Sequence, residues 1–434
     1  MSLAVHPKYE KYSRTNVSWI KQIPEGWKLL RIQDFSTFND EVIDERAFRN
    51  KTIRYVDISG VDSISNKYAF EEQNFSTAPS RARRLVRSGD TVFSTVRPYL
   101  KAVATIEQPE IDLVFSTGFA VIRPSENADP RFTGYAMRND PFINEVTANS
   151  VGASYPAINA TDLVKLHVPL PPLDEQRVIA SFLDDKCEKI DEAVRIKEAQ
   201  IALLRERRQI LIQEAVTRGL NPAAPMKDSS IDWIGQIPAH WELKRLKHLL
   251  NERNERSKNG EEPLLMVSQV HGLVVRADFH SKAEVSASNI DNKIVHENDL
   301  VFNKLKAHLG VFFKSNIQDV GIVSPDYAVY TPSGGIADSK FFELLFRHPA
   351  YIGQFIVRAT GIVEGLIRLY TSDLFDIHIA VPPENEQIEI ITYSNEISDK
   401  FNRAITLKQD QITALKEYKT SLINAAVTGK IKVI

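Results

Sequence analysis

Two halves of this 434-residue chain carry the same short motifs in the same order, and this duplication constrains the fold more than any other feature. Trp19 and Trp27 enclose a Gln-Ile-Pro motif, and the same motif returns between Trp233 and Trp241, about 210 residues later. Other blocks repeat at nearly the same offset: 90–93 (DTVF) with 299–302 (DLVF), 162–163 with 373–374 (DL), 171–172 with 382–383 (PP), 175–176 with 386–387 (EQ), and 215–217 with 426–428 (AVT). Because this period is far longer than a solenoid unit, the sequence predicts a duplicated pair of domains.

Both copies follow one internal plan. Each begins with a mixed segment, which we call a lobe, in which runs such as 91–96 are typical of strands. The lobe closes on an alternating strand, predicted at 164–168 or 375–379, and on a Pro-Pro pair, after which a helical pattern continues to Gly219 or Gly429. The predicted boundaries are 1–172 for the first lobe, 173–220 for the first long helix, 221–232 for a linker, 233–383 for the second lobe and 384–434 for the second long helix.

The two helical patterns are predicted to pair, because each carries an apolar seam whose spacing alternates between three and four residues. Helix two must run back toward the first lobe to pack beside helix one, so the pair is antiparallel with a pseudo-two-fold axis. Basic residues interrupt the seam at Lys197, Arg208, Lys408 and Lys419, where they either extend along the apolar surface or set the register. The predicted seam residues are Ile190, Val194, Ile201, Leu204 and Leu211 with Phe401, Ile405, Ile412, Leu415 and Leu422. The predicted fold class is therefore α+β: two tandem mixed α/β lobes, each followed by a long helix of an antiparallel coiled coil.

Composition excludes several classes of protein. Hydrophobic residues make up 43% and charged residues 25%, so each lobe can bury a core. The single cysteine, Cys187, excludes cysteine zinc sites and fits a reducing cytoplasm. No apolar run reaches the roughly 18 residues of a membrane span, so no membrane partner and a cytoplasmic location are expected. The net charge of −2 means that any contact with nucleic acid must use local positive charge.

A search for catalytic motifs finds none that holds in both copies. Residues 139–142 (NDPF) approach the loop of adenine methyltransferases, but the second copy keeps only Pro349, and a turn before a helix is the simpler interpretation. The nuclease-like string 242–244 (ELK) lacks a preceding Pro-Asp pair and is typical of solvated surface. His167 and His378 lie on predicted strands with no second metal ligand nearby. The sequence therefore predicts no catalytic residue, no metal site and no cofactor in this chain.

Basic and aromatic residues gather within each lobe, and Arg97 and Lys306 occupy equivalent positions. In a chain of this net charge, such a cluster is the local footprint that DNA phosphate and base-edge contacts need, although a solvated charged face is the alternative for any single residue. The candidate DNA-binding residues are Arg81, Arg83, Arg84, Arg87, Arg97, Tyr99 and Lys101 in the first lobe, and Lys304, Lys306 and His308 in the second.

The repeated motifs together resemble the specificity subunit of Type I restriction–modification enzymes, and the resemblance covers both halves. The motifs that carry it are 160–163 (ATDL), 169–173 (PLPPL) and 175–176 with their second-copy counterparts, 89–93 (GDTVF), and the two Gln-Ile-Pro-x-x-Trp openings. The resemblance implies that each lobe is a target-recognition domain for one half of a split, asymmetric double-stranded DNA sequence, with the helices as a spacer.

The resemblance also implies the partners. The helices would dock modification subunits, two in number, and restriction subunits would join in the full complex. S-adenosylmethionine, ATP and Mg²⁺ would belong to those subunits, and this chain would not be an enzyme. Two alternatives remain at this point: a coiled-coil scaffold that does not contact DNA, and a single-chain DNA methyltransferase or nuclease, against which the missing motifs argue.

Overall fold

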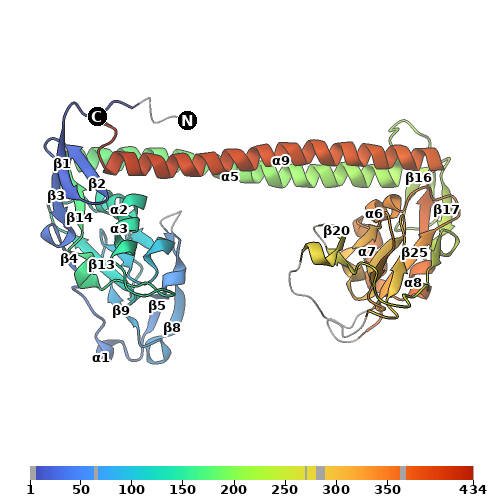
Figure 1. Cartoon of the computed structure of the whole chain (residues 1–434), viewed down its shortest axis with the longest axis horizontal. Coiled ribbons are helices and arrows are strands. Elements are labelled where there is room, and N and C mark those ends of the chain that lie inside the picture. The colour runs from blue at the N-terminus through green and yellow to red at the C-terminus, as the bar shows by residue number, and fades with distance from the viewer. Residues whose placement is uncertain (1–5, 63–66, 269–270, 280–288, 362–367, 434) are drawn as a thin grey trace. The chain divides into compact units, whose positions relative to one another are not determined.

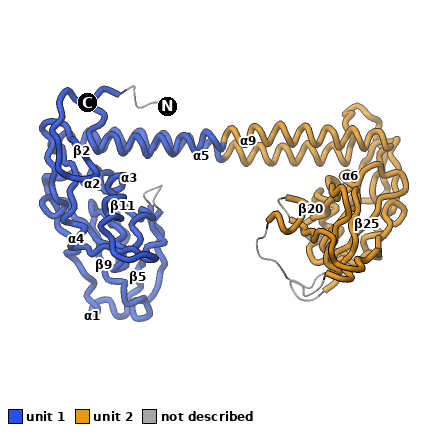
Figure 2. The backbone as a smooth tube through the Cα atoms, viewed as in Figure 1, with its two compact units in different colours: residues 1–198, 409–434 blue, residues 199–408 orange. Residues whose placement is uncertain are grey.

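The computed structural model describes residues 6–433 except 63–66, 269–270, 280–288 and 362–367, and the side chains of residues 307 and 308 are likewise outside the description. The chain divides into two compact units, coloured separately in Figure 2. Unit 1 comprises residues 1–198 and 409–434, and unit 2 comprises residues 199–408. Each unit therefore holds one lobe together with a stretch of both long helices.

The first lobe is built on two four-stranded sheets with the strand orders β11-β10-β13-β4 and β8-β5-β12-β9. Val92 of the central strand β10 packs between the sheets, whereas its neighbour Phe93 packs on the other face against α2 and α3. Both faces of β10 are buried, and all four of its residues, including the polar Thr91 and Ser94, are inaccessible to solvent. The strands are β1 (Tyr12–Val17), β2 (Ile20–Pro24), β3 (Lys28–Arg31), β4 (Ser36–Phe38), β5 (Thr52–Val56), β6 (Val61–Asp62), β7 (Lys67–Tyr68), β8 (Glu71–Asn74), β9 (Ala82–Leu85), β10 (Thr91–Ser94), β11 (Val103–Thr105), β12 (Leu113–Ser116), β13 (Phe119–Pro124) and β14 (His167–Leu170). The helices are α1 (Glu45–Phe48), α2 (Pro130–Arg138), α3 (Asp140–Ala148) and α4 (Ala160–Leu163).

The second lobe repeats this plan with a less regular second sheet. Its main sheet, β18-β25-β22-β23, matches β4-β13-β10-β11 strand for strand, but the second sheet consists of the pairs β19-β20 and β21-β24 joined by one parallel bridge, Leu264 to Ile322. The strands are β15 (Met226–Asp228), β16 (Gln236–Pro238), β17 (Glu242–Arg245), β18 (Leu250–Glu252), β19 (Leu265–Ser268), β20 (Gly272–Val275), β21 (Lys293–Val295), β22 (Leu300–Asn303), β23 (Phe312–Lys314), β24 (Gly321–Val323), β25 (Tyr327–Pro332) and β26 (His378–Val381). The helices are α6 (Lys340–Leu345), α7 (Pro349–Arg358) and α8 (Thr371–Phe375).

Two predicted segments differ in detail. The strand that closes each lobe begins at His167 or His378, three residues later than predicted, because the preceding residues are taken up by the end of α4 or α8 and the turn that follows it. In the first lobe, for example, the Val164 amide donates to the Ala160 carbonyl. Within the segment predicted as a linker, residues 226–228 form β15, which pairs with β16 of the second lobe.

The two predicted long helices are confirmed as α5 (Leu173–Arg218) and α9 (Glu384–Val427), labelled in Figure 1. In each unit they run antiparallel, and all ten predicted seam residues are buried or half-buried. Three of the four basic seam residues bond across the pair: Lys197 Nζ lies 2.7 Å from Gln411 Oε1, Lys419 Nζ lies 2.7 Å from both Asp191 carboxylate oxygens, and Arg208 donates to Asn402. These three residues therefore act as cross-helix contacts. Among the described residues, no helix is both long and apolar enough to cross a bilayer.

Each lobe is completed by the far end of the helix that follows the other lobe. Ala215 and Val216, at the end of α5, are buried with Trp241 in the core of unit 2. Ala426 and Val427, at the end of α9, are buried with Trp27 in the core of unit 1. The repeated Ala-Val-Thr and Gln-Ile-Pro-x-x-Trp motifs therefore contact each other, and this contact explains why both are duplicated.

The repeated Glu-Gln motif fixes the start of each helix to its own lobe. Gln176 is fully buried; its amide nitrogen lies 2.8 Å from the Pro171 carbonyl oxygen, and its amide oxygen accepts from the Asp129 amide at 2.8 Å. Gln387 makes the same pair of bonds, to the Pro382 carbonyl at 2.9 Å and from the Ala337 amide at 3.1 Å. A buried amide that satisfies backbone groups on two segments holds helix and lobe in one arrangement.

Candidate nucleic-acid interface

A buried ion pair supports the central strand of each lobe. Asp90, at the start of β10, is 1% exposed in its side chain, and its two oxygens accept from the Arg123 guanidinium at 2.7 and 2.8 Å. Asp299, at the start of β22, accepts from Arg253 in the same way at 2.8 and 3.1 Å. The paired arginine is held firmly in its charged form, because hydrogen bonding to Asp90 raises the pKa of Arg123. The repeated aspartate thus anchors the strand whose far end leads into the candidate residues.

The segment after β10 carries two residues in an unusual backbone conformation. Arg97 and Lys101 flank the single turn Pro98–Leu100, and both are left-handed, with φ of 50° and 58°. Long side chains disfavour this conformation, so neighbouring bonds must hold it. The Arg97 amide donates to the Pro156 carbonyl at 2.7 Å, and the Lys101 amide donates to the Pro98 carbonyl at 2.8 Å. Tyr99, within the turn, is exposed.

Most of the predicted first-lobe cations are neutralised by acidic neighbours. Arg81 Nη2 lies 2.7 Å from Asp57, Arg83 Nη2 lies 3.0 Å from Glu45, Lys101 Nζ lies 2.5 Å from Asp140, and Arg87 pairs with Glu41. The predicted cluster of Arg81, Arg83 and Arg87 is therefore distributed over separate ion pairs.

Arg84 and Arg97 differ from those cations, because neither forms an ion pair within the described part of the chain. Arg84 is half-buried on β9, and burial lowers the pKa of its guanidinium. The Arg97 guanidinium carbon lies 4.0 Å from the centre of the Tyr155 ring. Sequence reasoning missed Tyr155 because it lies far from Arg97 along the chain.

The second lobe presents a different set. Lys304 is 20% exposed in its side chain and lies 3.8 Å from Glu252, a carboxylate that it shares with the buried Lys293. Lys306 is exposed and has no ion pair among the described residues. The side chain of His308 lies outside the described residues. The three predicted positions share one short helical segment, Lys304–Leu309, which follows β22 as the Arg97 turn follows β10.

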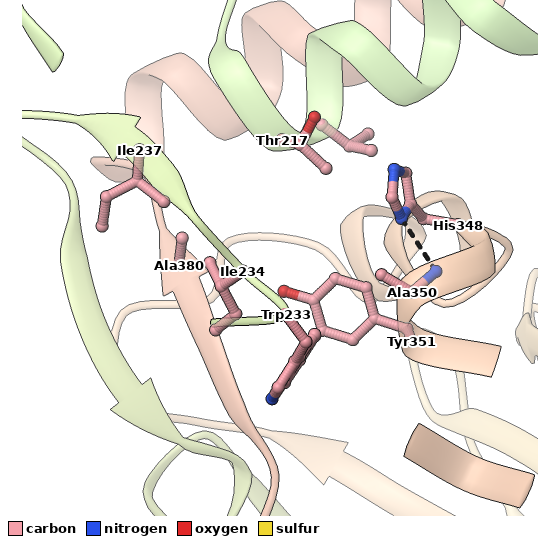
Figure 3. A pocket seen from close by; sticks show the side chains of 9 residues that line it. Thr217, Trp233, Ile234, Ile237, His348, Ala350, Tyr351 and Ala380 are labelled. Carbon is pink, nitrogen blue, oxygen red and sulfur yellow. Dashed lines mark hydrogen bonds between the residues drawn. The ribbon is translucent and has the colours of Figure 1, made fainter. Parts of the chain in front are cut away.

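A small cavity in unit 2 lies beside a histidine. One cavity of about 30 Å³ lies at the end of α5 in unit 2, where Figure 3 shows Thr217, Trp233, Tyr351 and His348 around it. It has room for about one water molecule. His348 Nδ1 accepts from the Ala350 amide at 3.2 Å, and burial lowers the pKa of the imidazole. A search of the described residues finds no group of His, Cys, Asp and Glu side chains that could hold a metal ion.

Comparisons with known proteins agree with this arrangement. Residues 24–202 match the family described as the type I restriction modification DNA specificity domain. The chain is 26% identical to a putative type I restriction enzyme MjaX specificity subunit of Methanocaldococcus jannaschii, over 98% of each chain. It is 22% identical to the EcoKI specificity subunit of Escherichia coli K12, over 88% of this chain and 86% of that one.

Solved structures show the same fold. A chain of a type I restriction–modification system, solved in work on complex assembly and conformational transition, matches with a TM-score of 0.70 and 25% identity, over 94% of this chain and 99% of that one. The HsdS subunit of Thermoanaerobacter tengcongensis matches in fold with a TM-score of 0.55 and 24% identity, over 94% and 98%.

The duplicated lobes, the paired helices and the matched domain define a DNA-specificity protein rather than an enzyme. The chain is similar to type I restriction–modification specificity subunits over nearly its whole length, and this similarity supports a non-catalytic subunit that recognises a DNA sequence. The fold expected from the repeated motifs is therefore confirmed, and the comparisons support the expected family.

Proposed function

We propose that this chain recognises a split, asymmetric DNA sequence, with one half-site for each lobe and a spacer set by the helix pair. The main support for the proposal is that the two lobes share a buried ion pair at the central strand, which we call the frame, but differ in the segment that follows this strand. The strands β10 and β22 are anchored alike by Asp90 and Asp299, but they lead into different segments, a strained turn in one lobe and a kinked helical turn in the other. Equivalent frames with different loops are suited to reading two different half-sites.

Among the predicted residues, Arg97 and Lys306 are the proposed first choices for DNA contact, because they lie in the segments that follow β10 and β22 and no carboxylate of the described residues pairs with them. Arg84 also lacks an ion pair among those residues, but it lies on β9, where burial disfavours its charged form. Arg81, Arg83, Arg87 and Lys101 would have to exchange an ion pair for a phosphate. Tyr99, Arg84, Lys304 and His308 remain secondary candidates in the same proposal.

The proposal includes partners and place of action. Two modification subunits dock on the helix pair, and restriction subunits join the complete complex. These partners bind S-adenosylmethionine, ATP and Mg²⁺, and this chain recognises the DNA sequence on which they act. The complex acts on DNA in the cytoplasm, with which a single buried cysteine, Cys187, is compatible.

The spacer can be tested by lengthening the helices. Inserting four residues after Gln200 adds about one turn, or roughly 5.4 Å, which is about 1.6 base-pair steps. With modification subunits present, methylation should move to a target with a longer spacer and unchanged half-sites. A two-residue insertion is the matched control, because it turns the seam away from α9 and should abolish activity instead. An active four-residue variant with an unchanged spacer would exclude the spacer role.

Exchanging lobes tests independent reading. Replacing residues 1–170 with the equivalent lobe of a relative should change one half of the methylated sequence and leave the other intact. A change in both halves would show that the lobes do not read independently. If the complex assembles but shows no sequence-specific DNA binding, the scaffold alternative is correct.

A further inference from the structure

The turn at 97–101 is connected to a second loop by backbone bonds. Val151 and Ala157 exchange two hydrogen bonds, of 2.8 and 3.0 Å between amide nitrogen and carbonyl oxygen. The Ile158 amide donates to the Thr95 carbonyl at 2.9 Å, and Val96 pairs with Ala157. The two loops therefore form one element at the end of β10.

The second loop projects an aromatic side chain into solvent. Gly152 has φ of 109°, and a Cβ at this position would lie 2.9 Å from the Tyr155 carbonyl oxygen, so only glycine permits this tight turn. Tyr155 is 68% exposed and Val151 is 82% exposed. Exposed tyrosines on constrained loops are common where a protein binds a partner.

The Arg97 guanidinium lies over the ring of Tyr155, which comes from the second loop. The guanidinium carbon lies 4.0 Å from the ring centre, and Arg97 Nε is buried without a hydrogen-bond partner among the described residues. Stacking uses the face of a guanidinium and leaves the N–H groups along its edge available. The left-handed backbone at Arg97 and the stacked ring together fix the plane of this cation, which a simple phosphate contact does not require.

We propose that Tyr155 is a positioning residue that stacks on Arg97 and orients its guanidinium edge to read one guanine of the first half-site. A planar, oriented arginine suits bidentate bonds to O6 and N7 of guanine in the major groove. The second lobe carries Lys306 at the equivalent place, and lysine has no plane to stack, so the assignment concerns the first half-site alone. This assignment rests on the proposed function and adds that Arg97, positioned by Tyr155, specifies one base pair.

The test uses the full chain reconstituted with its modification subunits and a set of duplexes. The duplexes carry the wild-type target, identified from the methylome, with each base pair substituted in turn. Arg97→Lys keeps the charge but loses the fork, and Tyr155→Leu removes the ring. Both should reduce discrimination at the same G·C pair of the first half-site by about 10- to 100-fold. Tyr155→Phe, which retains the ring face, should behave as wild type.

Three readouts separate this role from others. Preference at the second half-site, thermal stability and the dependence of binding on salt should all stay unchanged in Tyr155→Leu. The control is Tyr370→Leu, which removes another exposed tyrosine (48%, against 68% for Tyr155) in the second lobe and should alter no base preference in the first half-site.

Two results would overturn the assignment. One is a uniform loss of affinity for every sequence, with a salt slope lower by about one unit in Arg97→Ala, which marks a phosphate contact. The other is unchanged discrimination in both Arg97→Lys and Tyr155→Leu while the wild type reads a bipartite target. If the wild type itself reads no such target, the proposed function fails.

Discussion

The two lobes share a buried aspartate at the start of the central strand, but they supply its arginine from different strands. In the first lobe Arg123 comes from β13, whereas in the second Arg253 follows β18, the neighbour of the strand equivalent to β13. Asn39 occupies the first-lobe place of Arg253, since both amides donate to the same carbonyl position, Val121 or Val329. Both lobes thus have the charge pair, but the arginine comes from a different strand in each. A buried charge pair is therefore kept at the central strand although the sequence around it differs.

The largest loss of stability is expected when a charge is placed at the end of either long helix, where the helix packs into the core of a lobe. Ala215→Asp should destabilise the second lobe and Ala426→Asp the first, each by several kcal/mol, because an unpaired charge is buried in the core. Hydrogen exchange of the intact chain, resolved by peptide, measures each lobe separately. Ala202→Asp, at an exposed position of α5, is the matched control and should change neither lobe. Loosening of the first lobe by Ala215→Asp would contradict the assignment.

The next test transplants the first lobe's ion pair into the second. Arg253→Asn leaves Asp299 buried and without its arginine, which should cost about 3–5 kcal/mol. Thr331 lies where the first lobe has Arg123, and its hydroxyl is 3.2 Å from Asp299. Adding Thr331→Arg should therefore recover much of the lost stability. Urea denaturation followed by second-lobe hydrogen exchange provides the measurement. A double variant no more stable than Arg253→Asn would show that the two frames are not interchangeable.

The sequence predicted some features and could not predict others, for identifiable reasons. The long helices were predictable because they lack Gly and Pro and carry a seam such as Ile190, Val194 and Ile201. The partner of Asp90 was not, because the repeat marks the aspartate and the arginine comes from a different strand in each copy. Arg97 was identified from charge, but its contact with Tyr155 depends on two loops brought together by β-bridges between distant residues.

A smaller effect concerns the buried glutamines that join helix and lobe. Gln176→Ala and Gln387→Ala each leave buried backbone groups without partners, which should cost about 2–3 kcal/mol. The loss should be similar in the two units, since the bonds are equivalent. Gln200→Ala, exposed on α5, is the control and should change stability by less than about 0.5 kcal/mol. Unequal losses, measured by hydrogen exchange in each unit, would show that one lobe is joined to its helix by other contacts.

The smallest change in stability is expected at two equivalent contacts across the helix pair. Lys419 bonds to Asp191 in unit 1, and the same position in unit 2 pairs Arg208 with the neutral Asn402. Asn402→Asp should therefore create a second ion pair and stabilise unit 2, whereas Asp191→Asn should weaken unit 1. Because Asp191 is 52% exposed, each change should be no more than about 1 kcal/mol and should shrink at high salt. Urea denaturation at low and high salt measures both variants. A gain in Asn402→Asp that persists at high salt would mean that the new carboxylate acts through packing or hydrogen bonding rather than through its charge.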